Sequence, residues 1–231
     1  MLEIAGDKAA PLSEQAILCL RSDILSGTLA PGLQLKLDRL KDHYGFSSSP
    51  LREALNRLAA DGLVVIEDRR GFFVAPISID DIREITRLRQ LLEPEALSDS
   101  ISNGDDAWEA QIISAHYRLE RQEQRLKNNG ASEKPFFLDA EWADLHREFH
   151  RSLLAACNSP KLLHMRETLF YQAERYWHLW AMNHPAPPSR GSNHDRLRDA
   201  VLERDIVRSS DLLKNHISQT TEIVVKYLEQ E

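Results

Sequence analysis

A serine run that ends in a proline, residues 47–50, opens the segment that most constrains the fold of this chain. The apolar residues after it repeat at i, i+3, i+4 and i+7, and they are Leu51, Ala54, Leu55 and Leu58. This spacing marks one face of a helix with 3.6 residues per turn. The other face begins with the serine hydroxyls and continues with Arg52. The segment predicts an amphipathic helix, and its neighbours decide whether it is more than a surface helix with a serine cap.

Two further helices are predicted before this segment. Residues 13–26 carry the apolar period of an amphipathic helix, with Ser13 as its expected N-cap and Gly27 as its stop. A short helix is predicted at about residues 38–44 and ends at Gly45. Two short helices joined by a tight turn that contains glycine are typical of a helix-turn-helix.

After the third helix the pattern changes from helical to β. Residues 63–67 are rich in β-branched side chains and predict a strand, residues 68–71 a turn, and residues 72–75 the returning strand. A two-stranded hairpin directly after a helix-turn-helix is a wing. Arg69 and Arg70 at its tip could reach a phosphate or the minor groove of DNA. The alternative is a solvated turn.

From residue 80 onward the chain shows only helical patterns. The predicted helices are residues 80–103, 105–127, 137–157, 161–182, 193–204 and 205–228. About six helices with short connections predict an antiparallel bundle. Pro94 is expected to kink the first of these helices or open it locally, residues 184–191 predict a rigid loop, and Asp205 is an expected helix cap.

The expected fold class is therefore mainly α. A winged helix-turn-helix with a small β-hairpin wing, residues 1–76, precedes an antiparallel helical bundle, residues 77–231. The connector between them is expected at residues 76–79.

Composition excludes some classes of protein. The 231 residues are 42% hydrophobic, which is enough for a core, and no apolar run approaches the roughly 20 residues of a membrane span. The two cysteines are isolated, and no secretory signal is expected, so the interpretation is a cytoplasmic protein without a membrane partner. The net charge of −7 does not suggest nucleic acid by itself, but residues 1–76 are nearly neutral, with 9 basic and 10 acidic side chains.

A histidine pair suggests a metal site. His146 and His150 are four residues apart, so both imidazoles lie on one face of the predicted helix, beside Trp142, Phe149 and Leu153. Two such rings reach one point next to the helix, which supplies half of a metal site. The alternative is a pair of core histidines that are satisfied by hydrogen bonds.

Candidate ligands for an acid are found among the inward cations. Arg89 lies in the apolar stripe of its helix, where a buried guanidinium needs a carboxylate partner. Glu93, four residues on, could be that partner; alternatively Arg89 faces a cavity and holds an acidic ligand. Arg175 and Tyr176, in an aromatic-rich helix, are the next candidates for contact with an acid.

The N-terminal part resembles the winged-helix domain of GntR-type bacterial transcription regulators. The resemblance covers about residues 12–76 and rests on residues 29–32, 44–55, 58–63 and 70–74. It implies that the serine–proline helix is a recognition helix. With the wing and the preceding helix, the expected DNA-binding residues are Arg39, Ser47, Ser48, Ser49, Arg52, Arg69 and Arg70.

One position departs from the pattern of this family. Relatives usually carry Val-Ser-Arg-Thr-Pro where this chain has Phe-Ser-Ser-Ser-Pro, so Ser48 replaces an arginine that reaches a base. A bidentate arginine–guanine contact contributes about 1–3 kcal/mol of discrimination. We therefore expect a different operator, with Arg52 as the most important reading residue.

The C-terminal part resembles the all-helical ligand-sensing domain, FCD, of the FadR subfamily of GntR regulators. The residues that carry this resemblance are 88–94, 149–153, 158–160, 194–197 and 211–217. Metal-binding members of the subfamily use one carboxylate and three histidines. The histidines match His150, His194 and His216, and the position of the carboxylate is occupied by His146.

The resemblance thus implies a set of four imidazoles. A neutral all-histidine set suits Zn, Ni or Cu better than Mg or Ca, and Zn or Ni is the expected cofactor. Four neutral ligands would leave the site positive, which favours a carboxylate effector. Alternatively the pocket works without a metal, and the histidines bind the acid directly.

These features predict a ligand-responsive transcriptional regulator, expected to be a repressor and not an enzyme. The resemblance implies a homodimer that reads palindromic operator DNA, with a helical domain that binds a small carboxylic acid next to a divalent transition metal. One alternative is a helical-bundle metalloenzyme with an accessory winged helix, which would need a general base near the metal. Another is a winged helix for protein contacts with a purely structural bundle.

Overall fold

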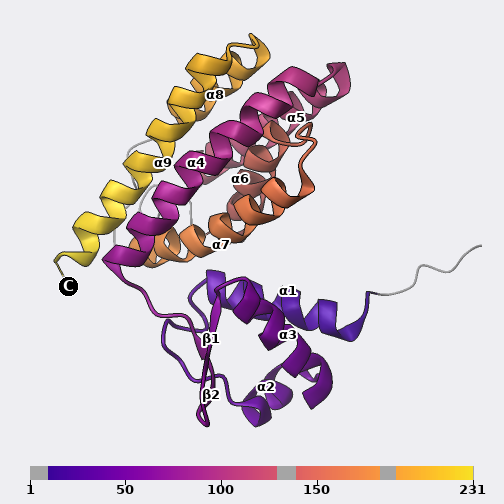
Figure 1. Cartoon of the computed structure of the whole chain (residues 1–231), viewed down its shortest axis with the longest axis vertical. Helices are drawn as coiled ribbons and strands as arrows, with labels where there is room; N and C mark the ends of the chain where they lie inside the picture. Colours follow the sequence, from indigo (N-terminus) through magenta and orange to yellow (C-terminus); the bar gives the residue numbers. More distant parts are fainter. Residues whose placement is uncertain (1–9, 129–138, 183–190, 231) are drawn as a thin grey trace, which may run out of the picture. The chain divides into compact units, whose positions relative to one another are not determined.

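The computed structural model describes residues 10–128, 139–182 and 191–230. The chain divides into two compact units, Met1–Pro76 and Ile77–Glu231, and Figure 1 colours the chain by sequence from indigo at the N-terminus to yellow at the C-terminus. Each unit has its own secondary structure and core. No helix among the described residues is long and apolar enough to cross a membrane.

The first unit holds three helices followed by a hairpin. Its elements are α1 (Leu12–Leu25), α2 (Leu37–Tyr44), α3 (Ser48–Ala60), β1 (Val64–Glu67) and β2 (Gly71–Val74). The apolar face predicted for α3 is confirmed, because Leu51, Ala54, Leu55 and Leu58 are completely buried. This face packs mainly against α1 and α2, so the opposite face of α3 is left to solvent.

Helix ends in this unit follow local chemistry. The predicted cap at Ser13 is wrong: α1 begins one residue earlier, with Pro11 at the N-cap, where a fixed φ suits the entry to a helix. The end of α2 is as predicted. Gly45 adopts the left-handed conformation (φ 72°), and its amide donates to the carbonyl of Lys41.

The hairpin forms a regular two-stranded antiparallel sheet. Val64 pairs with Val74 and Glu67 with Gly71, and Gln34 adds an isolated bridge to Phe73. The turn needs two left-handed residues, which are Arg69 (φ 60°) and Gly71 (φ 91°). The predicted wing is therefore confirmed, and Arg69 adopts a left-handed backbone conformation that residues other than glycine seldom adopt.

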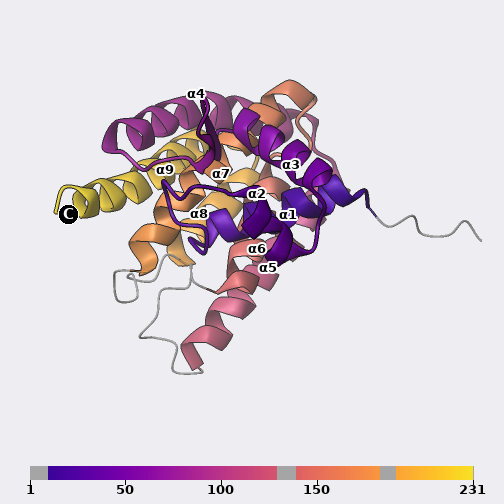
Figure 2. The ribbon, with the colours of Figure 1, turned by 90° about the horizontal axis from the view of Figure 1, so that it is seen from below.

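The second unit is a bundle of six helices within the described residues. They are α4 (Ile79–Asn103), α5 (Asp106–Asn128), α6 (Ala140–Leu153), α7 (Pro160–Met182), α8 (Gly191–Leu202) and α9 (Ile206–Leu228). α4 packs along α9 and α7, while α5 packs against α6 and α8, and Figures 1 and 2 show α4 and α9 running side by side in opposite directions. The predicted antiparallel bundle is thus confirmed.

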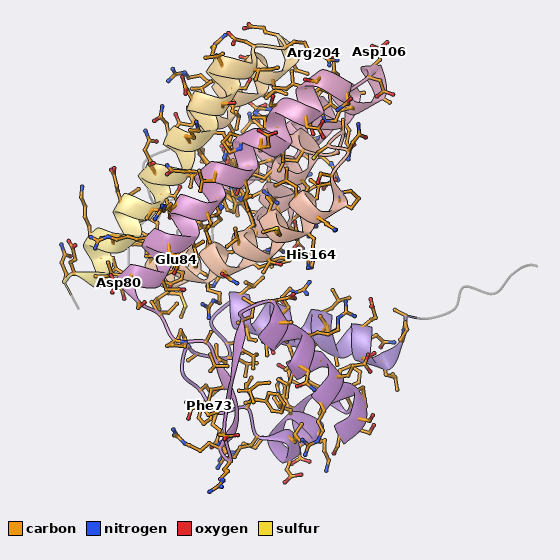
Figure 3. The ribbon with its side chains drawn as sticks, in the orientation of Figure 1. Phe73, Asp80, Glu84, Asp106, His164 and Arg204 are labelled. Atoms are coloured by element: carbon orange, nitrogen blue, oxygen red, sulfur yellow. The ribbon has the colours of Figure 1, made fainter. Side chains whose placement is uncertain are left out.

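The corner between α4 and α5 is closely packed. A Cβ on Gly104 would lie only 2.0 Å from the Trp108 ring. The Arg204 guanidinium donates to the carbonyls of Ile101 and Gly104 and pairs with Glu109. Figure 3 shows Arg204 at the same end of the bundle as Asp106. This arginine satisfies carbonyls that the end of α4 leaves without helical partners.

Some predicted helix limits need correction. α4 is continuous through the buried Pro94, so the helix does not open there. α6 ends at Leu153 rather than at 157, because the amides of Leu154 and Ala155 turn back to carbonyls only three residues earlier. Asp205 caps α9 as predicted, since its carboxylate accepts from the Arg208 amide at 3.0 Å.

Two predictions fall partly beyond the described residues. Residue 137, the predicted start of the third bundle helix, and residues 184–190 of the predicted loop lie outside them.

Candidate functional site

Four histidines from three helices meet inside the bundle. They are His146 and His150 on α6, His194 on α8 and His216 on α9. Each offers one ring nitrogen, and these nitrogens all lie within 4.8 Å of one another. The first three side chains are buried and His216 is partly buried. The structure thus brings together all four residues that the resemblance implied.

Aromatic packing fixes the two rings of α6. The indole of Trp142 stacks on His146 with centroids 4.6 Å apart and an interplanar angle of 17°. Phe149 makes edge contacts with His150 and His194 at 5.4 and 5.3 Å. Because Trp142, His146, Phe149 and His150 share the buried face of α6, the amphipathic pattern that folds the helix also aims its imidazoles inward.

The surroundings of His150 favour a neutral imidazole. Burial is the largest cause that holds the pKa of His150 well below its ordinary value, followed by the charges of His146, His216, His194 and Arg166. A neutral imidazole has a free lone pair, which is the form that binds a metal.

The donor set has the chemistry and the spacing of a site for one metal ion. Ligand bonds of about 2.0–2.1 Å from imidazole nitrogen to zinc imply distances of about 3.3 Å between ligand nitrogens. The Nε2 atoms of His146 and His150 lie 3.2 Å apart, and all four ligand nitrogens lie within 4.8 Å of one another. Four imidazoles favour zinc, nickel or copper over magnesium or calcium.

A pocket between α6 and α7 reaches the histidine cluster. Its lining is Trp142, Ala143, His146, Glu174, Trp177 and His178. Glu174 forms an ion pair with Arg147, which also pairs with Asp144. Burial raises the pKa of Glu174 to about 7 in spite of this partner. The pocket therefore joins a titratable carboxyl to one of the four candidate ligands.

The predicted partner of Arg89 is confirmed. Its Nε donates to the Glu93 carboxylate at 2.5 Å, and both side chains are almost completely buried. The guanidinium also lies over the rings of Phe170 and Trp177, with its carbon 5.1 and 5.2 Å from their centroids. Arg89 is thus positioned beside the aromatic residues that line the histidine cluster.

Arg175 and Tyr176 belong to α7 and lie next to the first turn of α4. The Tyr176 hydroxyl donates to the Asp81 carboxylate at 2.5 Å and accepts from the Ser78 amide at 3.2 Å. Arg175 is buried next to the Tyr176 ring. These contacts join α7 to the start of α4, so an effector-binding role for either residue stays a prediction.

Sequence reasoning missed Arg166. This residue is 2% exposed, lies on α7 and is one of the charges that lower the pKa of His150. Its spacing could have revealed it, because Arg166, Phe170, Ala173 and Trp177 repeat at helical intervals along one buried face.

The expected DNA-binding residues of the first unit are exposed. This holds for Arg39, Ser47, Ser48, Ser49, Arg52, Arg69 and Arg70. Ser47 is the N-cap of α3 without a side-chain cap bond, so its hydroxyl is not used to close the helix.

Ion pairs separate the cations of this unit into two groups. Arg21, Lys41, Arg57 and Arg70 each pair with a carboxylate. Among the described residues, no ion pair engages Lys36, Arg39, Arg52 or Arg69. Three of these four were predicted to bind DNA, and Lys36, at the N-cap of α2, adds a fourth exposed charge.

Comparison with known proteins matches both units. Residues 12–74 match "Bacterial regulatory proteins, gntR family", and residues 84–219 match the FCD domain. The transcriptional regulator BphR of Paraburkholderia xenovorans is 37% identical over 216 residues, which are 94% of this chain and 86% of BphR. The transcriptional repressor GlaR of Escherichia coli is 35% identical over 202 residues, 86% of this chain and 89% of GlaR.

Solved structures share the fold. E. coli McbR/YncC superposes with a TM-score of 0.78 at 23% identity and covers 96% of this chain and all of that chain. A GntR family member from Pseudomonas syringae is 28% identical with a TM-score of 0.52, over 96% of this chain and 88% of that one.

The matches in both units distinguish a transcriptional regulator from a metalloenzyme. The family and the relatives are transcriptional regulators, so the metalloenzyme alternative is set aside. The chain belongs to the GntR family of bacterial regulatory proteins and is a DNA-binding transcriptional regulator that carries an FCD ligand-binding domain.

Proposed function

We propose that this regulator is a repressor whose helical unit binds a small carboxylate beside a divalent transition metal. The observation that carries this proposal is the buried cluster of His146, His150, His194 and His216 within the FCD domain. The relative GlaR is named a repressor, which supports the direction of regulation.

The four histidines would hold the metal as neutral ligands. When bound, the ion supplies a positive Lewis-acidic centre that attracts a carboxylate oxygen. The low pKa of His150 favours its ligating form. The pocket between α6 and α7 gives an acid a path to His146.

Operator DNA would be read by the exposed face of α3, and the wing and α2 would hold its phosphates. Arg52 would read bases, with Ser47, Ser48 and Ser49 beside it, because these side chains are exposed at the N-terminal end of α3. Arg39, Arg69 and Arg70 would bind phosphates. The protein would act as a homodimer on a palindromic site.

Effector binding regulates only if it distinguishes the DNA-binding arrangement from another one. Residues 75–78, which lie outside any helix or strand, link the last strand of the first unit to α4. We propose that acid binding in the bundle changes the preferred orientation of the two units through this connector.

The DNA-binding part is tested by selecting sequences from random duplex DNA with the purified chain. A palindrome is expected, and Arg52→Ala should weaken binding to it at least tenfold. Arg57→Ala is a suitable control, because this arginine on the same helix pairs with Glu14. If Arg52→Ala binds the palindrome as well as the natural chain does, α3 does not read bases through Arg52.

The metal is tested by elemental analysis of the purified chain. One zinc or nickel ion per chain is expected, and His150→Ala should lose it and the response of DNA binding to small acids. His164→Ala is the matched control, since His164 lies exposed on α7 (Figure 3). A metal-free chain that still responds to acids after His150→Ala would overturn the proposed site.

A further inference from the structure

Arg166 is a buried cation in an otherwise apolar stripe. It precedes Phe170, Ala173 and Trp177 on the inward face of α7, and it is 2% exposed. Removing a guanidinium from water is costly unless its N–H groups and its charge find partners. The partners of Arg166 therefore show whether the folded chain alone accounts for its burial.

The folded chain satisfies only part of this guanidinium. Nη1 donates to Glu167 at 3.2 Å, while Nε lies 3.9 Å from the nearest Glu93 oxygen, too far for a hydrogen bond. Within the described residues, Nε and Nη2 have no hydrogen-bond acceptor. These two N–H groups form the edge with which arginine binds a carboxylate through two parallel hydrogen bonds.

The local charge is also unbalanced. Glu93 lies between two buried arginines, because its other oxygen accepts from Arg89 at 2.5 Å. The second carboxylate, Glu167, is 26% exposed and also pairs with Arg151. The interior next to Glu93 thus holds two cations and one anion, which favours the binding of another anion.

The free edge lies near the histidine cluster. The guanidinium carbon of Arg166 is 4.3 Å from the Phe170 centroid. On the same phenyl ring, His150 and His146 have centroid distances of 5.7 and 6.2 Å. Arg166 and both histidines therefore pack around one phenyl ring, which keeps them within reach of a short molecule with two acid groups.

We propose that the effector is a small dicarboxylate, with one carboxylate at the histidine cluster and the other on the Nε/Nη2 edge of Arg166. This inference rests on the proposed function, in which the cluster binds a carboxylate. A monocarboxylate would leave the buried edge without acceptors, and an unmade hydrogen bond to a charged group is costly. Arg166 then discriminates dicarboxylates from monocarboxylates.

Isothermal titration of the full chain as purified tests the proposal. The probes are the dicarboxylates from malonate to adipate, each compared with the monocarboxylate of the same carbon number. At least one dicarboxylate is expected to bind tenfold or more tightly than its monocarboxylate. Arg166→Lys keeps the charge and removes the planar fork, so the preference should fall below threefold while affinity for the monocarboxylate is unchanged.

Arg151→Lys is the matched control, because Arg151 shares Glu167 with Arg166 but is half exposed. It should leave both affinities unchanged.

If monocarboxylates bind and dicarboxylates bind no better, or if Arg166→Lys retains the preference, Arg166 is only a structural partner of Glu93. That result overturns the inference and leaves the proposed function intact. If no acid binds, both fail. The comparison of dicarboxylate with monocarboxylate affinity on the natural chain needs no variant, so it tests the inference even if Arg166→Lys does not fold.

Discussion

His146 places an imidazole where the metal-binding relatives of this family use a carboxylate. In the proposed metal site this exchange would remove one negative charge and leave four imidazoles, whose nitrogens lie within 4.8 Å of one another. Because carboxylates favour harder ions than imidazoles do, this single residue would set which metals the proposed site prefers.

We therefore predict that His146→Asp shifts metal preference toward manganese. The ratio of Mn²⁺ affinity to Zn²⁺ affinity should be at least tenfold higher in the variant than in the natural chain, because a carboxylate, which suits Mn²⁺, replaces an imidazole. Competition against a fluorescent chelator measures both affinities. His164→Asp, on an exposed part of α7, should change neither, and an unaltered Mn²⁺/Zn²⁺ ratio in His146→Asp would remove His146 from the ligand set.

Glu174 should give the bundle a pH-dependent stability. Its pKa is about 7 in the folded chain against 4.5 ordinarily, chiefly because of burial. Between these values the folded state keeps a proton that the unfolded state loses. The contribution of this group to the free energy of unfolding thus falls as pH rises from 4.5 to 7 and is constant above that range.

We predict that Glu174→Gln removes this dependence. Relative to the natural chain, the variant should gain about 1–3 kcal/mol between pH 5 and pH 8, by the 1.36 kcal/mol per pKa unit of linkage. Urea denaturation at both pH values measures the difference. Glu148→Gln removes an exposed carboxylate of α6 that pairs with Arg118 and is the control. Equal differences for Glu174→Gln at both pH values would contradict the assignment.

Among the elements, the α4–α5 corner has little room for a larger residue at Gly104. Gly104→Ala would place a Cβ about where the Trp108 ring lies, and the indole is held by a hydrogen bond from Nε1 to the Ser152 carbonyl at 2.9 Å. We predict a loss of about 1–3 kcal/mol in the free energy of unfolding, the usual cost of overpacking. Thermal denaturation measures it, with Ser102→Ala on the exposed end of α4 as control. A loss below about 0.5 kcal/mol, the size of an ordinary surface substitution, would show that the corner relaxes.

The same elements show what the sequence can predict. The recognition helix, the Gly45 stop and the wing follow from patterns within a few residues, so they were predicted correctly. The end of α6 was not, because the apolar period continues past Leu153 while the backbone already turns.

The candidate site likewise has one part that the sequence of a single helix predicts and another part that depends on packing. The pair His146 and His150 is visible in the spacing of one helix, whereas His194 and His216 join it only through the packing of α8 and α9 and were anticipated by family resemblance. Arg166 was missed, because its role depends on Glu93 and Phe170, and Glu93 lies on another helix.

For the whole molecule, the cations without ion pairs predict the salt dependence of DNA binding. Removing one cation that binds a phosphate should reduce the slope of log K against log salt by about 1. Arg39→Ala and Arg69→Ala should each do so and weaken all sequences alike, whereas Arg52→Ala should mainly reduce discrimination between sequences. Anisotropy titrations at several salt concentrations measure these slopes.

Arg21→Ala, which removes a guanidinium that pairs with Asp61, is the control and should keep the full slope. Unchanged slopes for Arg39→Ala and Arg69→Ala would exclude phosphate binding by these two arginines.

The four histidines come from α6 and from the two consecutive helices α8 and α9, and this arrangement has a consequence for the lifetime of the regulator. A metal ion on α6, α8 and α9 would act as a removable cross-link that closes a long loop between α6 and α8 and a shorter one between α8 and α9. Its binding energy would add to the stability of the folded state alone. A cell depleted of that metal would therefore hold a bundle that opens more often, is cut faster by proteases and is present in fewer copies. Metal supply would set the amount of repressor as well as its response.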